Sequence, residues 1–187
     1  INNGIDVNVF SPQRGDGIRL KYGLADKFIL LGVATEWGRR KGLHDFIELS
    51  KTLKDDEIIV LVGLKEDQIK ILPENIIGIT RTESTQELAE FYSSADVVMN
   101  ISYEETFGLT TVEGFACGTP GIVYNTTASP ELVDDSTGLI VDPGDIKGLL
   151  EAINHIKEKG KQFYTKSCVQ RAHRLYRKED RYREYIE

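Results

Sequence analysis

The chain has 187 residues, of which 40% are hydrophobic and 28% charged, a balance typical of one sizeable globular domain. Its formal net charge of −7 gives a nucleic-acid-binding role no electrostatic support. No apolar run approaches the roughly 20 residues needed to cross a bilayer. Two distant cysteines, Cys117 and Cys168, suggest neither a disulfide framework nor a metal motif, which favours a reducing cytoplasm.

The first segment, residues 1–26, is rich in turn signals. It contains Asn-Gly, Ser-Pro and Gly-Asp-Gly, with a short helix expected at 18–22. It starts at Ile1 without a methionine and reads like the interior of a polypeptide, so we expect a fragment of a longer protein. No basic stretch followed by an apolar run marks a signal peptide.

From residue 28 onward, predicted strands and helices alternate. Near-continuous apolar runs, typical of parallel strands buried on both faces, predict strands at Phe28–Val33, Glu57–Val62, Ile76–Ile79, 97–101, Gly121–Tyr124 and Gly138–Val141. Helices are expected at 42–53, at 66–72, from Ser84 with a capping-box glutamate at Glu87, from about Gly108, at 130–133, and from 142–145 through about Lys157. This alternation predicts an α/β domain with an open, mostly parallel sheet of about six strands, helices on both faces and right-handed crossovers.

The last segment, residues 162–187, is predicted to form a charged helix. Arginines and lysines alternate with tyrosines, and little apolar content remains to face a core. We expect a solvated terminal helix. The alternative is a helix that packs on a neighbour outside this chain.

The stretch from Asn100 to Pro120 is the most informative for function. A strand runs through a polar loop into a helix start, and α/β domains bind ligands at such carboxyl ends, where free N–H groups favour anions. Glu105 and Glu113, with seven residues between them, flank the helix start. Because a carboxylate repels an anion, a carboxylate in front of an anion site is expected to bind a group other than the anion, such as sugar hydroxyls. From the residues alone, a grip on a diphosphate sugar and a pair of solvated acids stay equally open.

The run E-T-F-G-L-T-T-V-E at 105–113, continued by G-F-A-C-G-T-P at 114–120, resembles the E-x7-E segment of retaining glycosyltransferases of family 4, which have the GT-B fold. Further matches follow in the same order: N-G-I-D at 3–6, R-K-G at 40–42, A-D-V at 95–97, S-P-E-L at 129–132 and T-G-L at 137–139. The resemblance covers almost the whole chain. It implies one Rossmann-like, nucleotide-sugar-binding domain over 1–187, half of a GT-B fold, with 1–26 as the hinge and leading segment and the N-terminal acceptor domain absent.

The resemblance also implies roles for single residues. Glu105 would contact the donor sugar near the reacting centre, and Lys41 would neutralise the diphosphate, where charge builds as the glycosidic bond breaks. Both are expected to be catalytic. Glu113 would hold the ribose hydroxyls. The other expected donor-binding groups are the backbone N–H groups of Phe107, Gly108 and Leu109, and Arg81 or Thr82 beside the base.

One position departs from the family pattern. Members commonly carry an arginine about six residues before the lysine, and this chain has Thr35 there. Either Arg39 or Arg40 is expected to supply the charge from the same loop. Trp37, also in this loop, is expected to stack on a base or an acceptor, or to line a cleft between domains.

The resemblance therefore implies a hexosyltransferase that uses a UDP- or GDP-linked sugar and a glycan or lipid-linked acceptor. We expect no cofactor, and we expect no metal because the three histidines are scattered with no partner acid at metal-ligand spacing. The expected location is cytoplasmic, including the inner face of the membrane. Two alternatives stay open: half of a sugar-nucleotide epimerase, which needs a histidine–carboxylate pair that the sequence does not reveal, and a non-catalytic, flavodoxin-like ligand-binding module.

Overall fold

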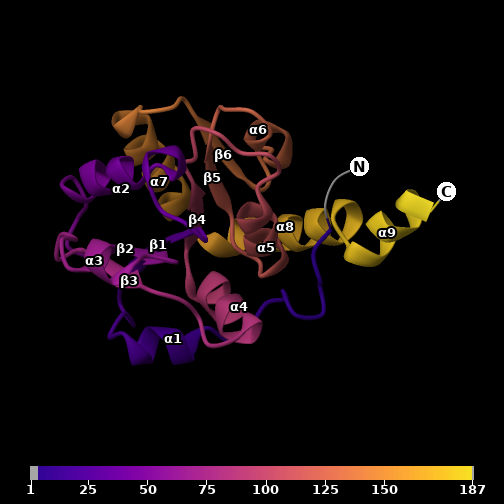
Figure 1. The fold of residues 1–187 in the computed structure, drawn as a ribbon, viewed down its shortest axis with the longest axis horizontal. Coiled ribbons are helices and arrows are strands. Elements are labelled where there is room, and N and C mark those ends of the chain that lie inside the picture. The colour runs from indigo at the N-terminus through magenta and orange to yellow at the C-terminus, as the bar shows by residue number, and fades with distance from the viewer. Residues whose placement is uncertain (1–3, 187) are drawn as a thin grey trace.

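Six parallel strands form the centre of the fold in the computed structural model, which describes residues 4–186 and the side chains of 4–183 (Figure 1). Asn3, part of the N-G-I-D match, lies outside the described residues. The order across the sheet is β3-β2-β1-β4-β5-β6. The strand bounds are β1 Phe28–Val33, β2 Glu57–Val62, β3 Ile76–Ile79, β4 Val97–Asn100, β5 Gly121–Tyr124 and β6 Gly138–Val141.

These bounds match the predicted strands, except that β4 ends at Asn100 rather than at residue 101. Each pair of neighbouring strands in this sheet is parallel, and β1 pairs with β2 along its whole length, from Phe28 opposite Glu57 to Val33 opposite Val62. The predicted parallel α/β sheet is therefore confirmed. The chain order reverses between β1 and β4, and open α/β sheets bind ligands at such a reversal.

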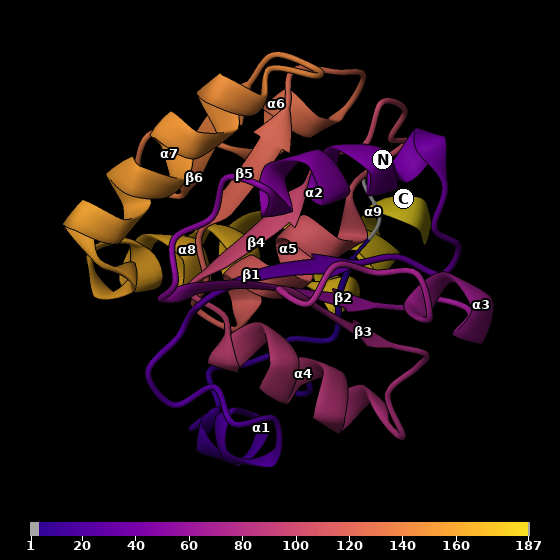
Figure 2. The ribbon, with the colours of Figure 1, turned by 90° about the vertical axis from the view of Figure 1, so that its left-hand side faces the viewer.

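Helices cover both faces of the sheet, as predicted (Figures 1 and 2). On one face, α2 and α7 pack together; on the other, α5 packs against α4 and α8, and α1 lies against α4. The bounds are α1 Asp16–Lys21, α2 Leu43–Ser50, α3 Glu66–Ile69, α4 Thr85–Ser94, α5 Leu109–Ala116, α6 Ser129–Leu132, α7 Ile146–Lys159, α8 Lys161–Leu175 and α9 Lys178–Ile186, with a 3-10 turn, η1, at Arg39–Lys41.

Only one of the two hydrogen bonds of the predicted capping box forms at the start of α4. The Ser84 hydroxyl accepts the N–H of Glu87 at 3.1 Å, as expected. The Glu87 carboxylate, however, accepts the N–H of Glu83 at 2.6 Å rather than that of Ser84, one residue away from the capping-box pattern. Helix α7 starts as predicted, because the Asp145 carboxylate accepts the N–H of Gly148 at 2.8 Å.

The C-terminal segment differs from the predicted solvated helix. It forms two helices, α8 and α9, and α8 packs along α5 with Tyr164, Cys168 and Ala172 buried. The prediction was wrong for α8, because its core-facing residues recur only at every fourth position. That spacing gives a narrow stripe on a helix, which dense charge on the other faces conceals.

The junction between α8 and α9 is tied to the start of the chain. The N–H of Ile5 donates to the carbonyl of Tyr176 at 2.8 Å, and the N–H of Lys178 donates to the carbonyl of Ile5 at 2.9 Å. Ile5 and Tyr176 are both buried. The leading segment therefore runs beside this junction, and α9 extends beyond it, away from the sheet (Figure 1).

Trp37 belongs to the core. It is 6% exposed, its indole Nε1 donates to the carbonyl of Val62 at 2.8 Å, and its ring meets Phe46 edge-on at 5.5 Å. The predicted stacking on a base or acceptor, or lining of a cleft, is therefore wrong, because the indole has its partners inside the domain. Within the described residues, no helix is long and apolar enough to cross a membrane.

The carboxyl end of β2 leaves no room for a side chain at Gly63. Its φ is 102°, and an added Cβ would lie 1.6 Å from the carbonyl oxygen of Ala34, which follows β1. We expect Gly63→Ala to lower the free energy of unfolding by at least about 3 kcal/mol in urea titrations, since strain and a backbone clash add. Gly17→Ala is the control: in α1, with open space, it should change stability by less than about 1 kcal/mol. Equal stability of the two variants would contradict the expectation.

Candidate functional site

The candidate site lies at the carboxyl ends of β1 and β4, where two loops touch through their backbones. The N–H of Tyr103 donates to the carbonyl of Arg40 at 2.8 Å. Gly42, with a φ of 75°, approaches so closely that an added Cβ would lie 2.3 Å from the carbonyl oxygen of Ile101. Only glycine fits this contact, and it brings the loop after β1 against the loop after β4.

The two predicted catalytic residues meet across this contact. Lys41 Nζ lies 3.0 Å from Glu105 Oε2, and both side chains are mostly buried. The amide of Asn100 donates to the same oxygen over a long 3.4 Å, and the N–H of Thr106 donates to Oε1 at 3.2 Å. Burial alone would raise the pKa of Glu105, but the Lys41 ammonium and these donors hold it below its usual value. Glu105 is therefore an anion at neutral pH.

Of the three backbone donors that the sequence predicts near the start of α5, one is taken by a side chain of the described region and two are not. Gly108 precedes the helix with a φ of 89°. Among the residues that the structure describes, no protein acceptor takes the N–H groups of Gly108 or Leu109. The N–H of Phe107 faces the Glu105 carboxylate, and the Phe107 ring meets Tyr176 edge-on at 5.7 Å. A helix start with free N–H groups beside a lysine can accept a phosphate.

Glu113 lies farther along α5, and among the described residues no hydrogen bond joins it to Lys41 or Glu105. The hydroxyl of the fully buried Tyr92 donates to Glu113 Oε2 at 2.7 Å. Burial raises the pKa of Glu113 to about 7, and the Tyr92 bond opposes that rise. Among the described residues, no protein donor contacts the second carboxylate oxygen.

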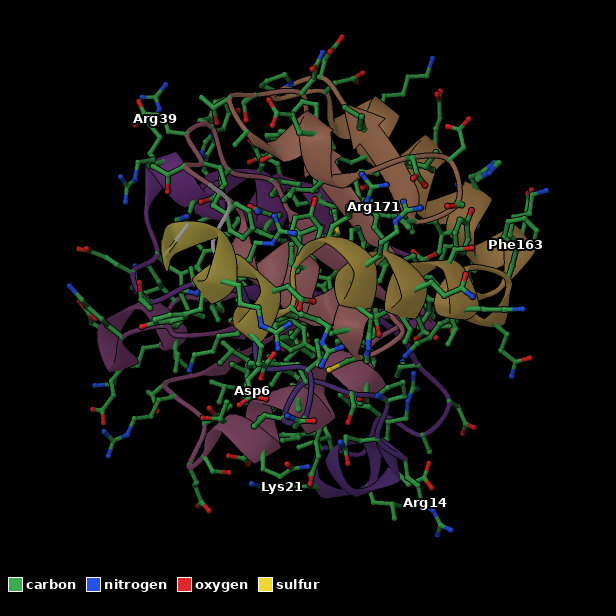
Figure 3. All side chains as sticks on the ribbon, turned by 90° about the vertical axis from the view of Figure 1, so that its right-hand side faces the viewer. Asp6, Arg14, Lys21, Arg39, Phe163 and Arg171 are labelled. Carbon is green, nitrogen blue, oxygen red and sulfur yellow. The ribbon has the colours of Figure 1, made fainter. Side chains whose placement is uncertain are left out.

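Among the described residues, no hydrogen bond or ion pair joins the side chains of the remaining predicted residues to Lys41 or Glu105. Thr35, Arg39 and Arg40 are exposed. Arg39 lines a shallow depression with Leu43, His44 and Ile47 of α2, and it points outward from the body (Figure 3). Arg39 therefore lies beside α2, whereas Arg40 does not line this depression.

Arg81 and Thr82 line a separate depression at the end of β3. In the sheet order, β3 is separated from β1 by β2. A ligand that joined this depression to the Lys41–Glu105 pair would therefore have to cross the end of β2, roughly 10 Å at the usual strand spacing.

Asp45 is a residue of the site region that the sequence analysis missed. It is 4% exposed, and its Oδ2 accepts the hydroxyls of Tyr103 at 2.8 Å and Tyr124 at 2.6 Å. Its Oδ1 lies 3.0 Å from His44 Nε2. Burial, followed by the bond to Asp45, raises the pKa of Tyr103 to about 12. One carboxylate thus ties α2 to the loop after β4 and to β5. The sequence signal for this role was an acidic residue among the regularly spaced apolar residues of α2.

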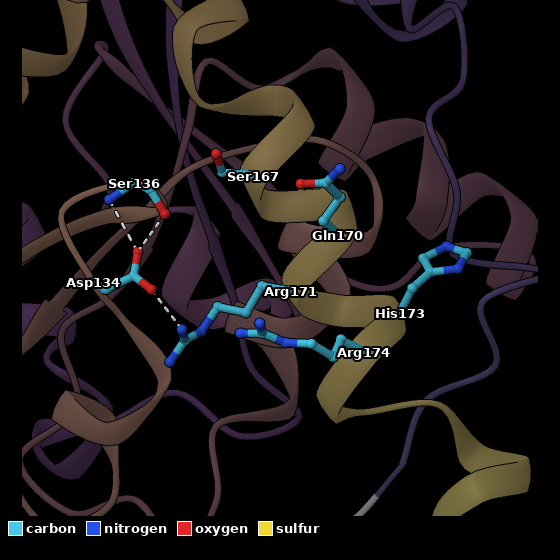
Figure 4. Close-up of a pocket in the computed structure, with 7 residues that line it drawn as sticks. All are labelled: Asp134, Ser136, Ser167, Gln170, Arg171, His173 and Arg174. Carbon is cyan, nitrogen blue, oxygen red and sulfur yellow. Dashed lines mark hydrogen bonds and ion pairs between the residues drawn. The ribbon is translucent and has the colours of Figure 1, made fainter.

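A polar depression on α8 is distinct from the candidate site (Figure 4). Its Arg171 is used structurally, because the guanidinium donates to the carbonyls of Leu132 and Glu131 and pairs with Asp134 at 2.5 Å. Across the described side chains, no group of three or more His, Cys, Asp or Glu residues is arranged to hold a metal ion.

Comparisons with known proteins agree on a family and a fold. A family model of group 1 glycosyl transferases matches residues 17–174. The D-inositol 3-phosphate glycosyltransferase of Arthrobacter sp. (strain FB24) is 32% identical over 169 residues, which are 80% of this chain and 40% of that protein. The one from Mycobacterium sp. (strain KMS) is 25% identical over 185 residues, 92% of this chain and 42% of its own length. The chain thus spans about two fifths of these relatives.

Two solved structures share the fold. Anabaena Alr3699/HepE, in complex with UDP and glucose, has a TM-score of 0.86 and 19% identity, and the match covers 98% of this chain and 54% of that one. The C-terminal domain of a group 1 glycosyl transferase, LpcC, from Francisella tularensis has a TM-score of 0.74 and 22% identity, covering 93% and 99%. Each likeness concerns the fold.

Glu113 should make stability depend on pH. Its pKa of about 7 in the folded chain lies above the ordinary 4.5, so the folded state holds the proton more tightly than the unfolded state. Stability from this group is present below about pH 4.5 and is lost as pH rises through 7, roughly 3 kcal/mol in all. In urea titrations at pH 5 and pH 8, Glu113→Gln should remove this loss, whereas Glu158→Gln, at an exposed position of α7, should keep it. An unchanged pH dependence in Glu113→Gln would refute the assignment.

Proposed function

The chain belongs to the group 1 glycosyl transferases, and we propose that it is the donor-binding half of a retaining hexosyltransferase. Its fold is the Rossmann-like half of the GT-B glycosyltransferases, as the sequence predicted. The full protein moves a hexose from a UDP- or GDP-linked sugar to a glycan or lipid-linked acceptor, which a further domain holds. The observation that carries this proposal is the Lys41–Glu105 pair beside the start of α5.

The proposed donor fits the charges of the site. Its diphosphate lies against the free N–H groups of Gly108 and Leu109 and draws the ammonium of Lys41. When the glycosidic bond breaks, its electron pair goes to the phosphate oxygen, and these fixed positive groups stabilise the charge that builds there. Glu105, ionised at neutral pH, accepts hydroxyl groups of the sugar, and Glu113 accepts those of the ribose through the oxygen that Tyr92 leaves open.

The epimerase alternative gains one feature from the structure, but that feature argues against catalysis. The expected histidine–carboxylate pair, which the sequence did not reveal, exists as His44 and Asp45 at 3.0 Å. Both oxygens of Asp45 are already engaged, and the carboxylate is almost fully buried. The carboxylate is therefore held by groups of the domain itself and is not open to a substrate. The family match favours a transferase over a non-catalytic module as well.

The proposal also covers the donor nucleotide, the need for a cofactor or metal, and the acceptor. A UDP-linked donor is supported by the fold's likeness to a protein solved with UDP-glucose. A cofactor and a metal are not needed, since Lys41 and the helix start can balance a diphosphate. A lipid-linked acceptor fits a cytoplasmic location at the inner face of a membrane.

Nucleotide binding tests this proposal. In calorimetric titrations with UDP, GDP and ADP, we expect one of them to bind this chain. Lys41→Met should weaken the binding about tenfold, because a charge-assisted contact to the diphosphate is lost. Glu113→Ala should weaken it by loss of the ribose contact. Lys166→Met, at an exposed position of α8, is the matched control and should leave the affinity unchanged.

Two results would count against the proposal. If none of the three nucleotides binds, the non-catalytic module becomes the better reading of the fold. If these 187 residues alone transfer a sugar to an acceptor, the division of the site between two domains is wrong.

A further inference from the structure

The loop after β5 holds an unusual backbone conformation at Thr127. Within the described residues, Thr127 is the one residue other than glycine with a positive φ, at 42°. A β-branched side chain is strained in this region, because its Cβ crowds the backbone. Thr127 is also exposed, so burial does not compensate the strain. The strain therefore points to a specific contact that needs this conformation.

That contact is with the backbone of Glu105, 22 residues earlier. The Thr127 hydroxyl accepts the N–H of Glu105 at 2.9 Å and donates to the carbonyl of Glu105 at 2.7 Å. A hydroxyl has one hydrogen and two lone pairs, so both bonds form at once. The N–H of Ala128 adds a longer bond of 3.4 Å to the same carbonyl. One side chain thus fixes both polar backbone groups of Glu105.

This anchor is separate from the contacts of the Glu105 carboxylate. The carboxylate is paired with Lys41 at 3.0 Å, and its other donors are a long bond from Asn100 at 3.4 Å and the neighbouring backbone N–H of Thr106 at 3.2 Å, with the Phe107 N–H facing it. A diphosphate that draws Lys41 toward itself weakens the ion pair at the moment when Glu105 is needed by the sugar. The position of Glu105 then depends on its backbone, and so on Thr127.

We propose that Thr127 is a positioning residue, which holds Glu105 toward the sugar of a nucleoside diphosphate sugar. The inference rests on the proposed function. Thr127 itself needs no contact with the donor. Its strained backbone is what aims the hydroxyl across the gap between the loops after β4 and β5.

The test compares a nucleotide with its sugar conjugate. Calorimetry on the 187-residue chain would use UDP and UDP-glucose, or GDP and GDP-mannose if GDP is the nucleotide that binds. This chain is suitable because its buried residues form one contiguous core and the C-terminal domain of the Francisella protein has been solved by itself. The measured quantity is the ratio of the two affinities, since Glu105 should contribute only to the sugar.

Thr127→Gly removes the hydroxyl and the strain together. We expect it to lower the affinity for the sugar nucleotide about five- to tenfold relative to the nucleotide alone, with an unchanged or raised melting temperature. Thr127→Ser keeps the hydroxyl and should keep the wild-type ratio. Thr126→Ala, at the neighbouring residue, is the matched control. It removes a hydroxyl that donates to the carbonyl of Ser102 at 2.8 Å and should leave the ratio unchanged.

The outcomes separate the two proposals. A wild-type chain that binds no nucleotide and no sugar nucleotide would overturn the proposed function itself. A chain that binds both, with the same ratio in Thr127→Gly as in wild type, would overturn only the role of Thr127. So would an equal change of the ratio in Thr126→Ala, because general loosening of the loop would then explain it. If Thr127→Gly does not fold, Thr127→Ala decides by the same ratio.

Discussion

The structure depends on the backbone contact between the loops that follow β1 and β4. The two strands are neighbours in the sheet although two other strands and three helices lie between them in the chain. Gly42 allows the carbonyl of Ile101 to approach, and the bond from Tyr103 to Arg40 fixes the distance. Any side chain at residue 42 would separate the loops and with them Lys41 and Glu105. The charge pair is thus a consequence of backbone geometry.

The charges around this contact are balanced in the ligand-free chain. Lys41 and Glu105 neutralise each other in a mostly buried position, where separating a pair without replacement is costly. A diphosphate sugar offers both replacements in one molecule, negative charge for the lysine and hydroxyl donors for the glutamate. Asp45 fixes the surroundings of the same contact, because its carboxylate accepts the hydroxyls of Tyr103 and Tyr124 and lies beside His44. The site therefore combines a fixed frame with an exchangeable ion pair.

Sequence reasoning succeeded where the signal is local and failed where it is not. Strands buried on both faces read as continuous apolar runs, so their bounds were predicted almost to the residue. The family resemblance predicted that Lys41 and Glu105 belong to one site, but it did not predict their ion pair, which joins residues 64 positions apart. The Asp45 network joins residues 58 and 79 positions apart, and the strained Thr127 reaches 22 positions back, so no local pattern carries either. The stripe of α8 was overlooked because its residues are small or aromatic and widely spaced among charges.

The tie between Ile5 and the α8–α9 junction has a mechanical consequence. Tyr176, whose carbonyl receives the N–H of Ile5, also packs its ring against Phe107. Phe107 directly precedes Gly108, the N-cap residue of α5. A rearrangement of the leading segment at this junction would therefore act directly on the Phe107–Tyr176 pair. Such a change would be transmitted to the start of α5, the proposed phosphate site, across the single residue Gly108.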